Sequence, residues 1–418
     1  MKNIAIVGCG SRGQMFARLI SRDKNSRLAA IAETVADSLE LVGNLYDVPK
    51  DMRFASADDF FARGKIADAV LICTQDAQHK EMALKALELG YDILLEKPAA
   101  ATIEDCIAIR DTANRLGRKV MLTHVLRYSP FYRYIKQLIM DGKLGKIVNI
   151  EQTENVAYWH FGLSYVRGPW RSMEDSTPTI IAKCCHDLDL LVWLMDKKAN
   201  KVSSFGKLFW FKSENAPEGS AAFCCDCPES VREKCLYNAY TVYPERIKRA
   251  VVGGLARIRE KNIYDILAEK QDPVSRCIYH SENDAIDNQV VNLEFEDGSN
   301  ANLTMTAFSA ECYRVTHVHG TAGDVYGNSE DGLLHVNIYG EKEKIVDVSK
   351  EKLFNTDDIE LDDGHGGGDY YLYKDFIDYI TADSPSVTRT TIDQSIESHV
   401  LGFKAEESRL DGGKVIKL

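Results

Sequence analysis

The first twenty residues constrain the fold more than any other feature of the chain. A short apolar run, Ile4–Val7, leads directly into Gly8-Cys9-Gly10-Ser11-Arg12-Gly13, and a helix-period segment follows over Gly13–Ser21. In this G-x-G-x-x-G spacing the first glycine permits a tight turn, the second lets the backbone approach a pyrophosphate, and the third lets the helix pack on the strand. The N–H groups at the start of that helix can then bind the anion. The pattern predicts a strand, a turn and a helix that bind a dinucleotide.

The context of this turn matters, because a strand–turn–helix without a ligand can show the same glycines. Short β-branched runs alternate with helix-period segments over residues 1–123, as is typical of a parallel sheet buried on both faces. Right-handed crossovers then give a doubly wound Rossmann sheet. The predicted strands are Ile4–Val7, Leu28–Ala32, Ala69–Cys73, Ile93–Leu95 and Val120–Thr123, and the predicted helices are Gly13–Ser21, Ala36–Leu45, Gln78–Leu89 and Ile103–Leu116.

The end of the second predicted strand indicates which dinucleotide binds. Glu33 stands there, about 20 residues beyond the glycines, where an acidic side chain accepts hydrogen bonds from the adenosine ribose. Its charge would repel a 2′-phosphate, so the sequence favours NAD over NADP. Arg12 leaves NADP open, because a nearby Arg can accommodate that phosphate.

After His124 the pattern changes to longer strands in which apolar and polar residues alternate. We therefore predict a second α/β domain over residues 124–418, with an open, mainly antiparallel sheet and a Cys-containing insertion at about residues 213–275. The predicted strands are Ile147–Val156, Val290–Phe295, Ala301–Phe308 and Val315–Gly320, and the predicted helices are Ile180–Met195, Arg246–Lys261, Tyr370–Thr381 and Ile392–Arg409.

Charge and hydropathy exclude several classes of function. The 418 residues include 51 Lys and Arg against 63 Asp and Glu, a net charge of −12, which repels nucleic-acid phosphates and anionic lipid. No apolar run approaches the roughly 20 residues that span a bilayer, and the apolar run at the N-terminus is too short for a signal peptide. The 11 Cys are interpreted as mostly reduced thiols. We expect a cytoplasmic protein with no nucleic-acid or membrane partner.

Two further motifs resemble those of a known family. Asp92-Ile93-Leu94-Leu95-Glu96-Lys97-Pro98 resembles the Glu-Lys-Pro signature of the Gfo/Idh/MocA oxidoreductases, and Thr74-Gln75-Asp76-Ala77-Gln78-His79 resembles the loop after their fourth strand. More loosely, the resemblance extends through Trp170-Arg171, the helix around His186 and Gly366-Gly367-Gly368-Asp369. It implies a nucleotide-binding domain followed by an α/β domain, with catalysis between them on sugars, polyols or their derivatives. The predicted cofactor contacts are Gly8, Gly10, Ser11, Arg12, Gly13, Glu33, Thr74, His79 and Glu96.

Lys97 is the first predicted catalytic residue. It follows a parallel strand at its carboxyl end, where doubly wound folds bind their ligands. Its ammonium can donate to the reacting oxygen of the substrate and stabilise a developing alkoxide.

His186 is the second predicted catalytic residue, since imidazole titrates near neutrality and can take a hydroxyl proton as hydride leaves. On one continuous helix Lys183 and His186 would share a face, and Asp187 would lie close to it. The family helix commonly carries an Asp four residues before this His, where the chain has Ala182. That accessory role is therefore vacant or passes to Lys183, which we include as a catalytic candidate.

The substrate contacts rest on less specific patterns. The turn at His124-x-x-Arg127-Tyr128 either faces the substrate or forms a network at the domain hinge. Arg167-Gly168-Pro169-Trp170-Arg171 suits a sugar platform with hydroxyl donors, or packing between subunits. The glycine loop before Asp369 either holds a diol or is an ordinary loop into a helix. The predicted substrate contacts are His124, Arg127, Tyr128, Trp170, Arg171, Asp187, His365 and Asp369.

A cysteine cluster lies within the predicted insertion. Cys224, Cys227 and Cys235 have the spacing C-x2-C-x7-C, and thiolates so close can share one structural Zn²⁺, which needs four ligands. The fourth would come from elsewhere, with Cys277 and His280 as candidates. An iron–sulfur cluster is a second way for these thiolates to bind metal, but the familiar ferredoxin spacings are absent. We predict a structural zinc, the alternative being a buried cluster of reduced thiols.

These patterns together predict an NAD(P)-dependent oxidoreductase that moves hydride between nicotinamide and a hydroxyl carbon of a sugar, polyol or related compound. Two alternatives stay open. One is an NAD-dependent glycoside hydrolase that oxidises, eliminates and re-reduces, as relatives in the family do. The other is an NAD-binding sensor, which would need neither Lys97 nor His186. The resemblance also implies a homo-oligomer, a dimer or a tetramer.

Overall fold

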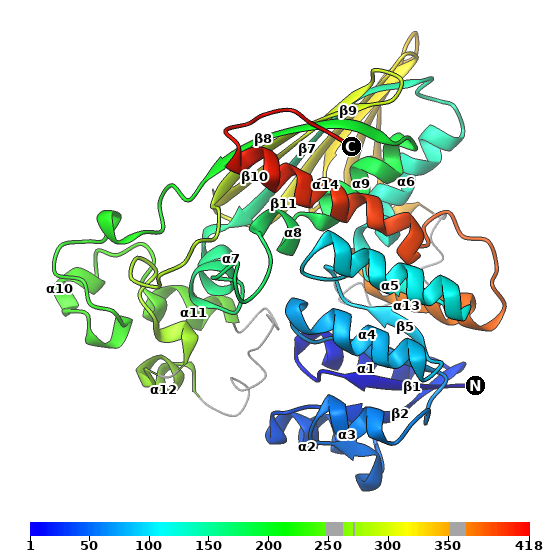
Figure 1. Cartoon of the computed structure of the whole chain (residues 1–418). Coiled ribbons are helices and arrows are strands. Elements are labelled where there is room, and N and C mark those ends of the chain that lie inside the picture. Colours follow the sequence, from blue (N-terminus) through cyan, green and yellow to red (C-terminus); the bar gives the residue numbers. More distant parts are fainter. Residues whose placement is uncertain (248–261, 271, 352–364) are drawn as a thin grey trace.

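The computed structural model describes residues 1–247, 262–270, 272–351 and 365–418 (Figure 1). Within these residues two sheets form the framework, a six-stranded sheet in the first domain and a nine-stranded sheet in the second. A group of short helices lies to one side of both sheets (Figure 1). Of the predicted helix Arg246–Lys261, only residues 246 and 247 are described, as the end of α11 (Ala239–Ile247), and the remainder lies outside the described residues.

The first domain is the parallel, doubly wound sheet that the sequence predicts. Its strand order is β3-β2-β1-β4-β5-β6, and every neighbouring pair is parallel. The sequence prediction missed β3 and α3, because a two-residue strand shows no periodicity. The strands are β1 (Lys2–Val7), β2 (Ser26–Ala32), β3 (Arg53–Phe54), β4 (Ala69–Ile72), β5 (Asp92–Leu95) and β6 (Val120–Leu122), and the helices are α1 (Ser11–Arg22), α2 (Ala36–Leu45), α3 (Ala57–Ala62), α4 (His79–Glu88) and α5 (Ile103–Leu116).

Both faces of this sheet are covered, as its continuous apolar strands require. On β1, Ile4 and Ile6 belong to one buried cluster together with Phe16 of α1. Their neighbour Val7 belongs to a second cluster together with Phe60 of α3. Because successive side chains of a strand point to opposite faces, the two clusters lie on the two sides of the sheet. The carboxyl ends of β1, β4 and β5 then form one edge, where the glycine turn and Lys97 come together.

The second domain has an open sheet in the order β14-β13-β12-β11-β7-β10-β9-β8-β15. It is mainly antiparallel, as predicted, and β7 with β10 is its parallel pair. Burial alternates along β9 and β10, so one face packs on helices and the other is open. The strands are β7 (Ile147–Ala157), β8 (Ala199–Lys207), β9 (Asn288–Phe295), β10 (Asn300–Ser309), β11 (Tyr313–Gly320), β12 (Gly323–Asn328), β13 (Leu333–Ile338), β14 (Lys344–Asp347) and β15 (Ile416–Lys417).

The helices α6 (Pro130–Met140), α9 (Cys185–Met195) and α14 (Ile392–Leu410) pack on one face of the nine-stranded sheet (Figure 1). The helix α13 (Gly368–Thr381) contacts the first domain at α1. The segment before α14 also reaches the first domain, since the backbone N–H of Leu122 in β6 donates to the carbonyl of Thr390 over 2.8 Å. The C-terminal part of the chain therefore ties the two domains together.

One predicted helix is wrong. The segment Ile180–Met195 forms two helices, α8 (Thr179–Ala182) and α9, with a break at Lys183 and Cys184. In a continuous helix the carbonyl of Ala182 would accept the N–H of His186. Here that carbonyl accepts the ammonium of Lys97 from the first domain, over 2.6 Å. A contact between the domains therefore replaces a helical hydrogen bond, and Lys183 and His186 do not share a helix face.

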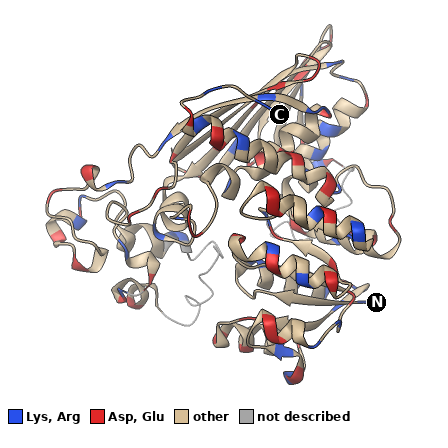
Figure 2. Cartoon of the chain, viewed as in Figure 1, with Lys and Arg blue, Asp and Glu red and all other residues tan. Residues whose placement is uncertain are grey.

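The insertion has a small core of its own. It contains α10 (Glu229–Arg232), α11 and α12 (Ile263–Ala268), and a separate buried cluster includes Cys224, Tyr243 and Leu267. Figure 2 shows Asp and Glu spread over both domains and this insertion, with Lys and Arg between them. Among the helices that the structure describes, none combines the length and hydropathy needed to cross a membrane.

Candidate active site

The turn between β1 and α1 has the geometry that a dinucleotide requires. Gly8 has a φ of +93°, and a Cβ there would lie 2.5 Å from the carbonyl oxygen of Cys73. A Cβ at Gly13 would lie 1.9 Å from the carbonyl oxygen of Gly8, whereas a Cβ at Gly10 would meet nothing within 4 Å. Gly10 caps α1 without a side-chain hydrogen bond. The turn therefore leaves open space at Gly10, beside the helix start, and an NAD pyrophosphate fits there.

Glu33 is held beside this turn. Its carboxylate accepts the backbone N–H of Cys9 over 2.7 Å and that of Val35 over 2.8 Å. Each oxygen of an ionised carboxylate has two acceptor positions, so the side chain can still accept ribose hydroxyls. The ribose contact stays a prediction, and it is compatible with the position of Glu33 at the carboxyl end of β2.

Arg12 lies in the first turn of α1, between two carboxylates of different domains. It forms ion pairs with Glu96, directly after β5, and with Asp369 in α13, the latter over 2.8 Å. His365 also contacts Asp369, over 2.9 Å. Burial alone would raise the pKa of Asp369, but Arg12 and His365 hold that pKa well below its usual range. The predicted diol site at Asp369 is thus an ion pair between the domains, and its contact with substrate stays a prediction.

The loop after β4 is fixed by buried polar groups. His79 has no exposed surface, and its two ring nitrogens lie 2.7 Å from the carbonyl of Pro98 and 3.2 Å from that of Thr74. His79 therefore joins this loop to the segment that carries Lys97. Its predicted contact with the cofactor, and that of Thr74, stay predictions.

Asp76 belongs to the same loop and was missed in the sequence. This carboxylate is only 3% exposed and accepts the indole N–H of Trp170 at 3.2 Å and the hydroxyls of Ser176 and Thr177 at 3.0 Å each. The three donors come from the second domain, so Asp76 is a contact between the domains. Trp170 presents its ring to Tyr165, at 5.9 Å between centroids. The sugar platform at Trp170 and Arg171 stays a prediction.

Lys97 and His186 come together from the two domains. Lys97 follows β5, and its ammonium bonds to Ala182 at the end of α8, four residues before His186 in α9. The ring of His186 is 9% exposed, and within the described residues its Nδ1 has no hydrogen-bond partner. Burial, followed by the charge of Lys97, lowers the pKa of His186 well below its ordinary value. The imidazole is therefore neutral at pH 7 and can accept a proton.

Three further imidazoles surround this pair. His124 packs edge-to-face on His186, with 5.6 Å between ring centroids, and tilted on His399 of α14 at 5.4 Å. His365 lies 6.4 Å from His186. Because Nε2 of His399 accepts the backbone N–H of Ala99, its Nδ1 carries the proton that it donates to the carbonyl of Ser395. We call His124, His186, His365 and His399 the histidine cluster.

His160 also lies near the two lysines and was missed in the sequence. It belongs to the short helix α7 (Tyr158–Phe161), directly after β7. Burial, followed by the charges of Lys183 and Lys97, lowers the pKa of His160 to about 3. No spacing or motif in the sequence marks His160, because its position near the two lysines depends on where β7 ends in the folded domain.

Lys183 and Asp187 belong to a buried group of four charges, which we call the charge cluster. Glu154 of β7 pairs with Lys183 over 3.1 Å and with Arg314 of β11 over 2.6 Å. Arg314 also donates from Nε to Asp187 over 2.8 Å. Burial would lower the pKa of Lys183, but Glu154 raises it, so the ammonium stays charged. Asp187 has no exposed surface, and its predicted contact with substrate, like a catalytic role of Lys183, stays a prediction.

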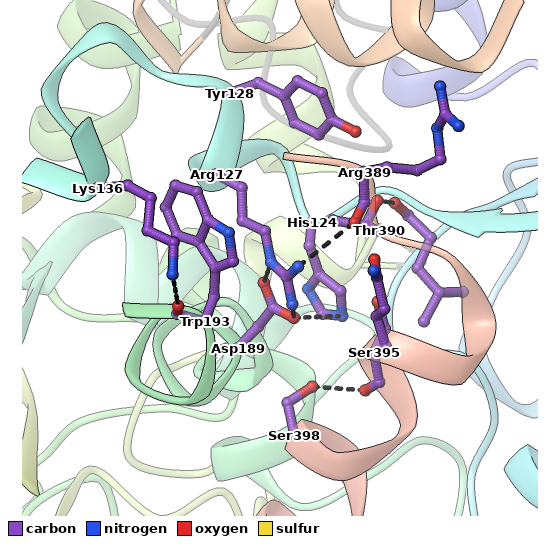
Figure 3. Close-up of polar contacts among 12 residues, drawn as sticks. His124, Arg127, Tyr128, Lys136, Asp189, Trp193, Arg389, Thr390, Ser395 and Ser398 are labelled. Carbon is purple, nitrogen blue, oxygen red and sulfur yellow. Dashed lines mark hydrogen bonds and ion pairs between the residues drawn. The ribbon is translucent and has the colours of Figure 1, made fainter. Parts of the chain in front are cut away.

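The turn at residues 124–128 forms a network at the domain junction (Figure 3). Arg127 holds Asp189 with two hydrogen bonds of 2.6 and 2.7 Å, and Tyr128 donates to Asp375 over 2.8 Å. Nε2 of His124 lies 4.0 Å from Asp189. Burial raises the pKa of Asp189, and Arg127 opposes that rise. These contacts match the hinge interpretation of this turn, and contacts with substrate stay a prediction.

Three cysteines of the insertion and one that follows it line a single cavity. Cys224, Cys227 and Cys235 face it, and so does Cys277, whereas His280 bonds to Ser220 instead. A closed zinc site has Zn–S bonds of about 2.3 Å, so its sulfurs stand roughly 3.8 Å apart. Within the described residues, the groups of three or more His, Cys, Asp or Glu ligand atoms that converge within 4.8 Å include no cysteine. The structural zinc therefore stays a prediction, and the sulfurs stand farther apart than it requires.

Comparisons with known proteins agree with this architecture. Residues 2–124 match the oxidoreductase family model of the NAD-binding Rossmann fold, and residues 136–415 match the model of its C-terminal α/β domain. YteT of Bacillus subtilis, named as an oxidoreductase, is 27% identical over 412 residues, which cover 90% of this chain and 88% of YteT.

Two relatives with named reactions match part of the chain. The 2,7-anhydro-N-acetylneuraminate hydratase of Mediterraneibacter gnavus is 28% identical over 207 residues, 48% of this chain and 51% of the hydratase. Inositol 2-dehydrogenase 2 of Saccharopolyspora erythraea is 27% identical over 198 residues, 47% of this chain and 54% of that enzyme. The chain thus spans about half the length of these two relatives.

Solved structures show the same fold. The WlbA dehydrogenase of Bordetella pertussis, in complex with NADH and UDP-GlcNAcA, has a TM-score of 0.67 at 16% identity and covers 100% of this chain and 97% of its own. The two family models together span nearly the whole sequence, in the order that its two domains follow. The chain therefore belongs to the Gfo/Idh/MocA oxidoreductase family, with an NAD-binding Rossmann domain followed by a C-terminal α/β domain.

Proposed function

We propose that the protein is an NAD(P)-dependent dehydrogenase that acts on a hydroxyl carbon of a sugar, polyol or related compound. The observation that carries the proposal is the meeting of Lys97 and neutral His186, from different domains, at the edge of the sheet that holds the glycine turn. A relative of the chain is named as an inositol dehydrogenase, and a structural neighbour is a dehydrogenase in complex with NADH and a nucleotide sugar, which supports this substrate class.

The two side chains have complementary roles in the reaction. His186 takes the proton of the substrate hydroxyl, since its imidazole is neutral and has an unpartnered nitrogen. Lys97 donates to the same oxygen and stabilises the alkoxide as it forms. Nicotinamide, when bound, accepts the hydride. In the reverse direction the imidazolium returns the proton to the oxygen of the carbonyl product.

A panel of sugars and polyols, followed by NADH absorbance, tests the reaction. A steady rise in NADH with one substrate class supports a dehydrogenase. If no sugar, polyol or hydroxy acid in the panel reduces NAD, and none of the matching carbonyl compounds consumes NADH, the proposal fails.

Cofactor binding has a test of its own. The Cβ position at Gly10 faces open space, so Gly10→Val should place a branched side chain where the pyrophosphate lies and abolish NAD binding measured by calorimetry. A folded variant with unchanged affinity would remove the turn from the cofactor site. Glu33 supports a preference for NAD over NADP. Glu33→Ala should therefore bring the dissociation constants for NAD and NADP closer together.

Redox-assisted elimination or hydrolysis is the second candidate. The relative named as a 2,7-anhydro-N-acetylneuraminate hydratase favours it, and so does Ala182 at the position where the family commonly has Asp. Such an enzyme regenerates its NAD in every cycle. It would consume a glycoside or anhydro-sugar without accumulating NADH, which separates the two reactions in one assay.

The assembly and location of the protein complete the proposal. The open face of the nine-stranded sheet exposes Phe205, Phe308 and Ile345, and this supports a homo-dimer or tetramer that covers the face. Light scattering on the purified protein distinguishes these from a monomer. We retain a cytoplasmic location, which a fluorescent fusion would test.

A further inference from the structure

Two histidines and a glutamate meet on the open face of the nine-stranded sheet. Within the described residues, Glu151, His317 and His319 each offer one ring nitrogen or carboxylate oxygen, and these three atoms lie within 4.8 Å of one another. We propose that the three side chains, which we call the sheet-face site, bind a divalent transition-metal ion, with Zn²⁺ as the ion that fits best. The proposal is independent of the dehydrogenase reaction and of the zinc predicted at the cysteines.

The register of the sheet places the three side chains next to one another. His317 and His319 are two residues apart on β11, so both side chains point to the same face. Thr316 and Val318 point to the other face and are fully buried. In the antiparallel pair of β7 with β11, Glu151 lies directly opposite His317, and His319 is its diagonal neighbour (Figure 1). The site therefore follows from the pairing of two neighbouring strands.

The distances suit a single ion. The rings of His317 and His319 lie 3.7 Å apart between centroids, and Nε2 of His319 lies 3.9 Å from a carboxylate oxygen of Glu151. Ligand atoms bound to Zn²⁺ at about 2.0–2.2 Å in a tetrahedron stand roughly 3.4 Å from one another. Glu151 is exposed and both histidines are partly exposed, so rotation of their terminal bonds can close the remaining distance.

The donor atoms select the kind of ion. Imidazole nitrogen suits Zn²⁺, Cu²⁺ and Ni²⁺, whereas Mg²⁺ and Ca²⁺ take oxygen ligands. Two imidazoles and one carboxylate leave the fourth position of a tetrahedral ion open, and a water molecule can fill it. All three ligands belong to one chain, so the site is complete without a second copy.

Asp324 of β12 provides an independent observation. Its carboxylate accepts a hydrogen bond from Nε2 of His317 over 3.0 Å and one from the side-chain amide of Asn337 over 3.1 Å. Because an ionised carboxylate only accepts, the proton of His317 is on Nε2, and Nδ1 keeps the lone pair that a metal requires. Metal-binding histidines commonly have such a carboxylate partner, which orients the ring and raises its basicity. Together with Glu151, Asp324 supplies two negative charges near a doubly charged ion.

A third histidine on the same face lies outside the site. The ring of Tyr326 lies 5.2 Å from that of His317 and stacks on His335 of β13 at 4.6 Å. His335 pairs with Glu343 over 2.9 Å, and within the described residues it belongs to no group of three converging ligand atoms. His335 therefore offers a matched control for the two proposed histidine ligands.

The ion would join two strands that are also joined on their buried face. There Glu154 of β7 pairs with Arg314 of β11 over 2.6 Å. On the open face, Glu151 and His317 would join the same strands through the ion. Binding would stabilise the folded chain, because the unfolded chain does not hold the three ligands together. We expect a structural role, with no part in the hydride transfer.

Zinc titration of the whole chain tests the site. Protein stripped of metal with a chelator and then dialysed should bind Zn²⁺ in a calorimetric titration, and an equal concentration of Mg²⁺ should not compete. The double variant His317→Gln/His319→Gln should bind one ion fewer per chain. Because the cysteines are the same in both proteins, this difference counts the sheet-face site alone. Equal zinc binding by the two proteins would overturn the proposal, and so would competition by Mg²⁺.

Single variants assign the ligands and the partner of His317. Asp324→Asn should weaken zinc binding by about 10- to 100-fold, the usual effect of losing the partner of a ligating histidine. Glu151→Gln should weaken it further, since it removes a charged ligand, whereas His335→Gln should keep the affinity of the wild type. Unchanged affinity in Glu151→Gln, or its loss in His335→Gln, would contradict the assignment.

Thermal unfolding gives a second readout. Added Zn²⁺ should raise the unfolding midpoint of the wild type and of His335→Gln, and it should leave that of the double variant unchanged. An equal rise in all three proteins would place the ion elsewhere. Should the double variant fail to fold, Glu151→Gln and His335→Gln still decide the proposal, because Glu151 is exposed and its substitution leaves the buried face of the sheet intact.

Discussion

Two buried polar clusters lie near the start of α9. They offset the free-energy cost of burying polar side chains in opposite ways. In the charge cluster, Glu154 and Asp187 are matched by Lys183 and Arg314, and each charge touches an opposite one. In the histidine cluster, the rings pack on one another, and both ring nitrogens of His124 lack a hydrogen-bond partner within the described structure. The first group is balanced by fixed charges, whereas in the second group burial lowers the pKa values of His124, His186 and His399 and keeps these rings neutral.

This difference separates a cluster that stabilises the fold from a cluster that can take part in proton transfer. A matched set of buried charges resists any change of protonation, because removing one proton or one side chain leaves an unpaired charge. A neutral imidazole with an unpartnered nitrogen is available to accept a proton from a ligand, because no buried partner depends on its charge. We therefore expect the charge cluster to stabilise the second domain. We expect the histidine cluster, together with Lys97, to carry out the proton transfer. Three experiments test this division.

The largest effect is expected from breaking the charge cluster. Arg314→Met leaves Glu154 and Asp187 with one cation between them, and removing one partner of a buried ion pair typically costs about 3–5 kcal/mol of the free energy of unfolding. Urea unfolding followed by circular dichroism measures the loss. As a control, Lys404→Met removes an exposed partner of Glu407 and should cost less than about 1 kcal/mol. Equal losses in the two variants would contradict the special role of the charge cluster.

The second effect concerns turnover. His186→Asn or Lys97→Met should each lower kcat by about 100-fold or more, equivalent to about 2.7 kcal/mol, the scale for losing a positioned proton acceptor or an alkoxide stabiliser. NAD affinity should change little, since neither side chain is expected to bind the phosphates.

The matched control for turnover is Lys85→Met, since Lys85 forms exposed ion pairs far from the glycine turn in sequence. Its kcat should equal that of the wild type. A His186→Asn enzyme with full turnover would show that another imidazole accepts the proton, and His160 would be the first to examine.

The smallest effect expected from a single side chain is that of His124 on the pH dependence of stability. Burial lowers the pKa of His124, and the nearby charges of His399, Arg127 and Lys97 lower it further. The unfolded chain therefore binds a proton below about pH 6.5 that the folded chain does not, so stability falls as the pH falls. Each histidine that stays neutral at pH 5 contributes a loss of about 2 kcal/mol between pH 6.5 and 5.

Thermal unfolding at pH 7, 6 and 5 measures this loss. The midpoint of the wild type should decrease steadily as the pH falls. The midpoint of His124→Gln should decrease less, because this variant lacks one of the groups that must stay neutral in the folded chain. His335 pairs with Glu343 at the surface, and His335→Gln serves as the control with the wild-type slope. A midpoint independent of pH over this range would contradict the neutral state of His124, His186 and His399.

Local patterns were sufficient for most of the first domain. The glycine turn, the order of strands and helices and the position of Lys97 all depend on residues close together in the sequence, where periodicity and spacing are informative. Local patterns also supplied His186 as a candidate base; that role stays a prediction, and the influence of Lys97 on its pKa was found only in the structure. The strand β3 was missed because its two residues contain too little pattern.

The second domain shows where such patterns fail. Helical periodicity over Ile180–Met195 is genuine, yet the helix breaks at Lys183 and Cys184. The carbonyl of Ala182 before the break accepts the ammonium of Lys97, 85 residues earlier in the chain. Glu154 and Arg314 lie 160 residues apart on strands that are neighbours only in the folded sheet. No pattern in the amino-acid sequence relates residues that lie so far apart along the chain.

The sequence by itself therefore determined the fold class, the dinucleotide turn and the two side chains expected to act on the substrate, because each follows from contiguous residues and their local geometry. The tertiary structure alone decided which groups are neutral, which are paired and which cysteine joins the cavity. Those properties depend on burial and on charges brought together from distant segments: the pKa of His186 is lowered first by burial and then by the charge of Lys97 from the other domain.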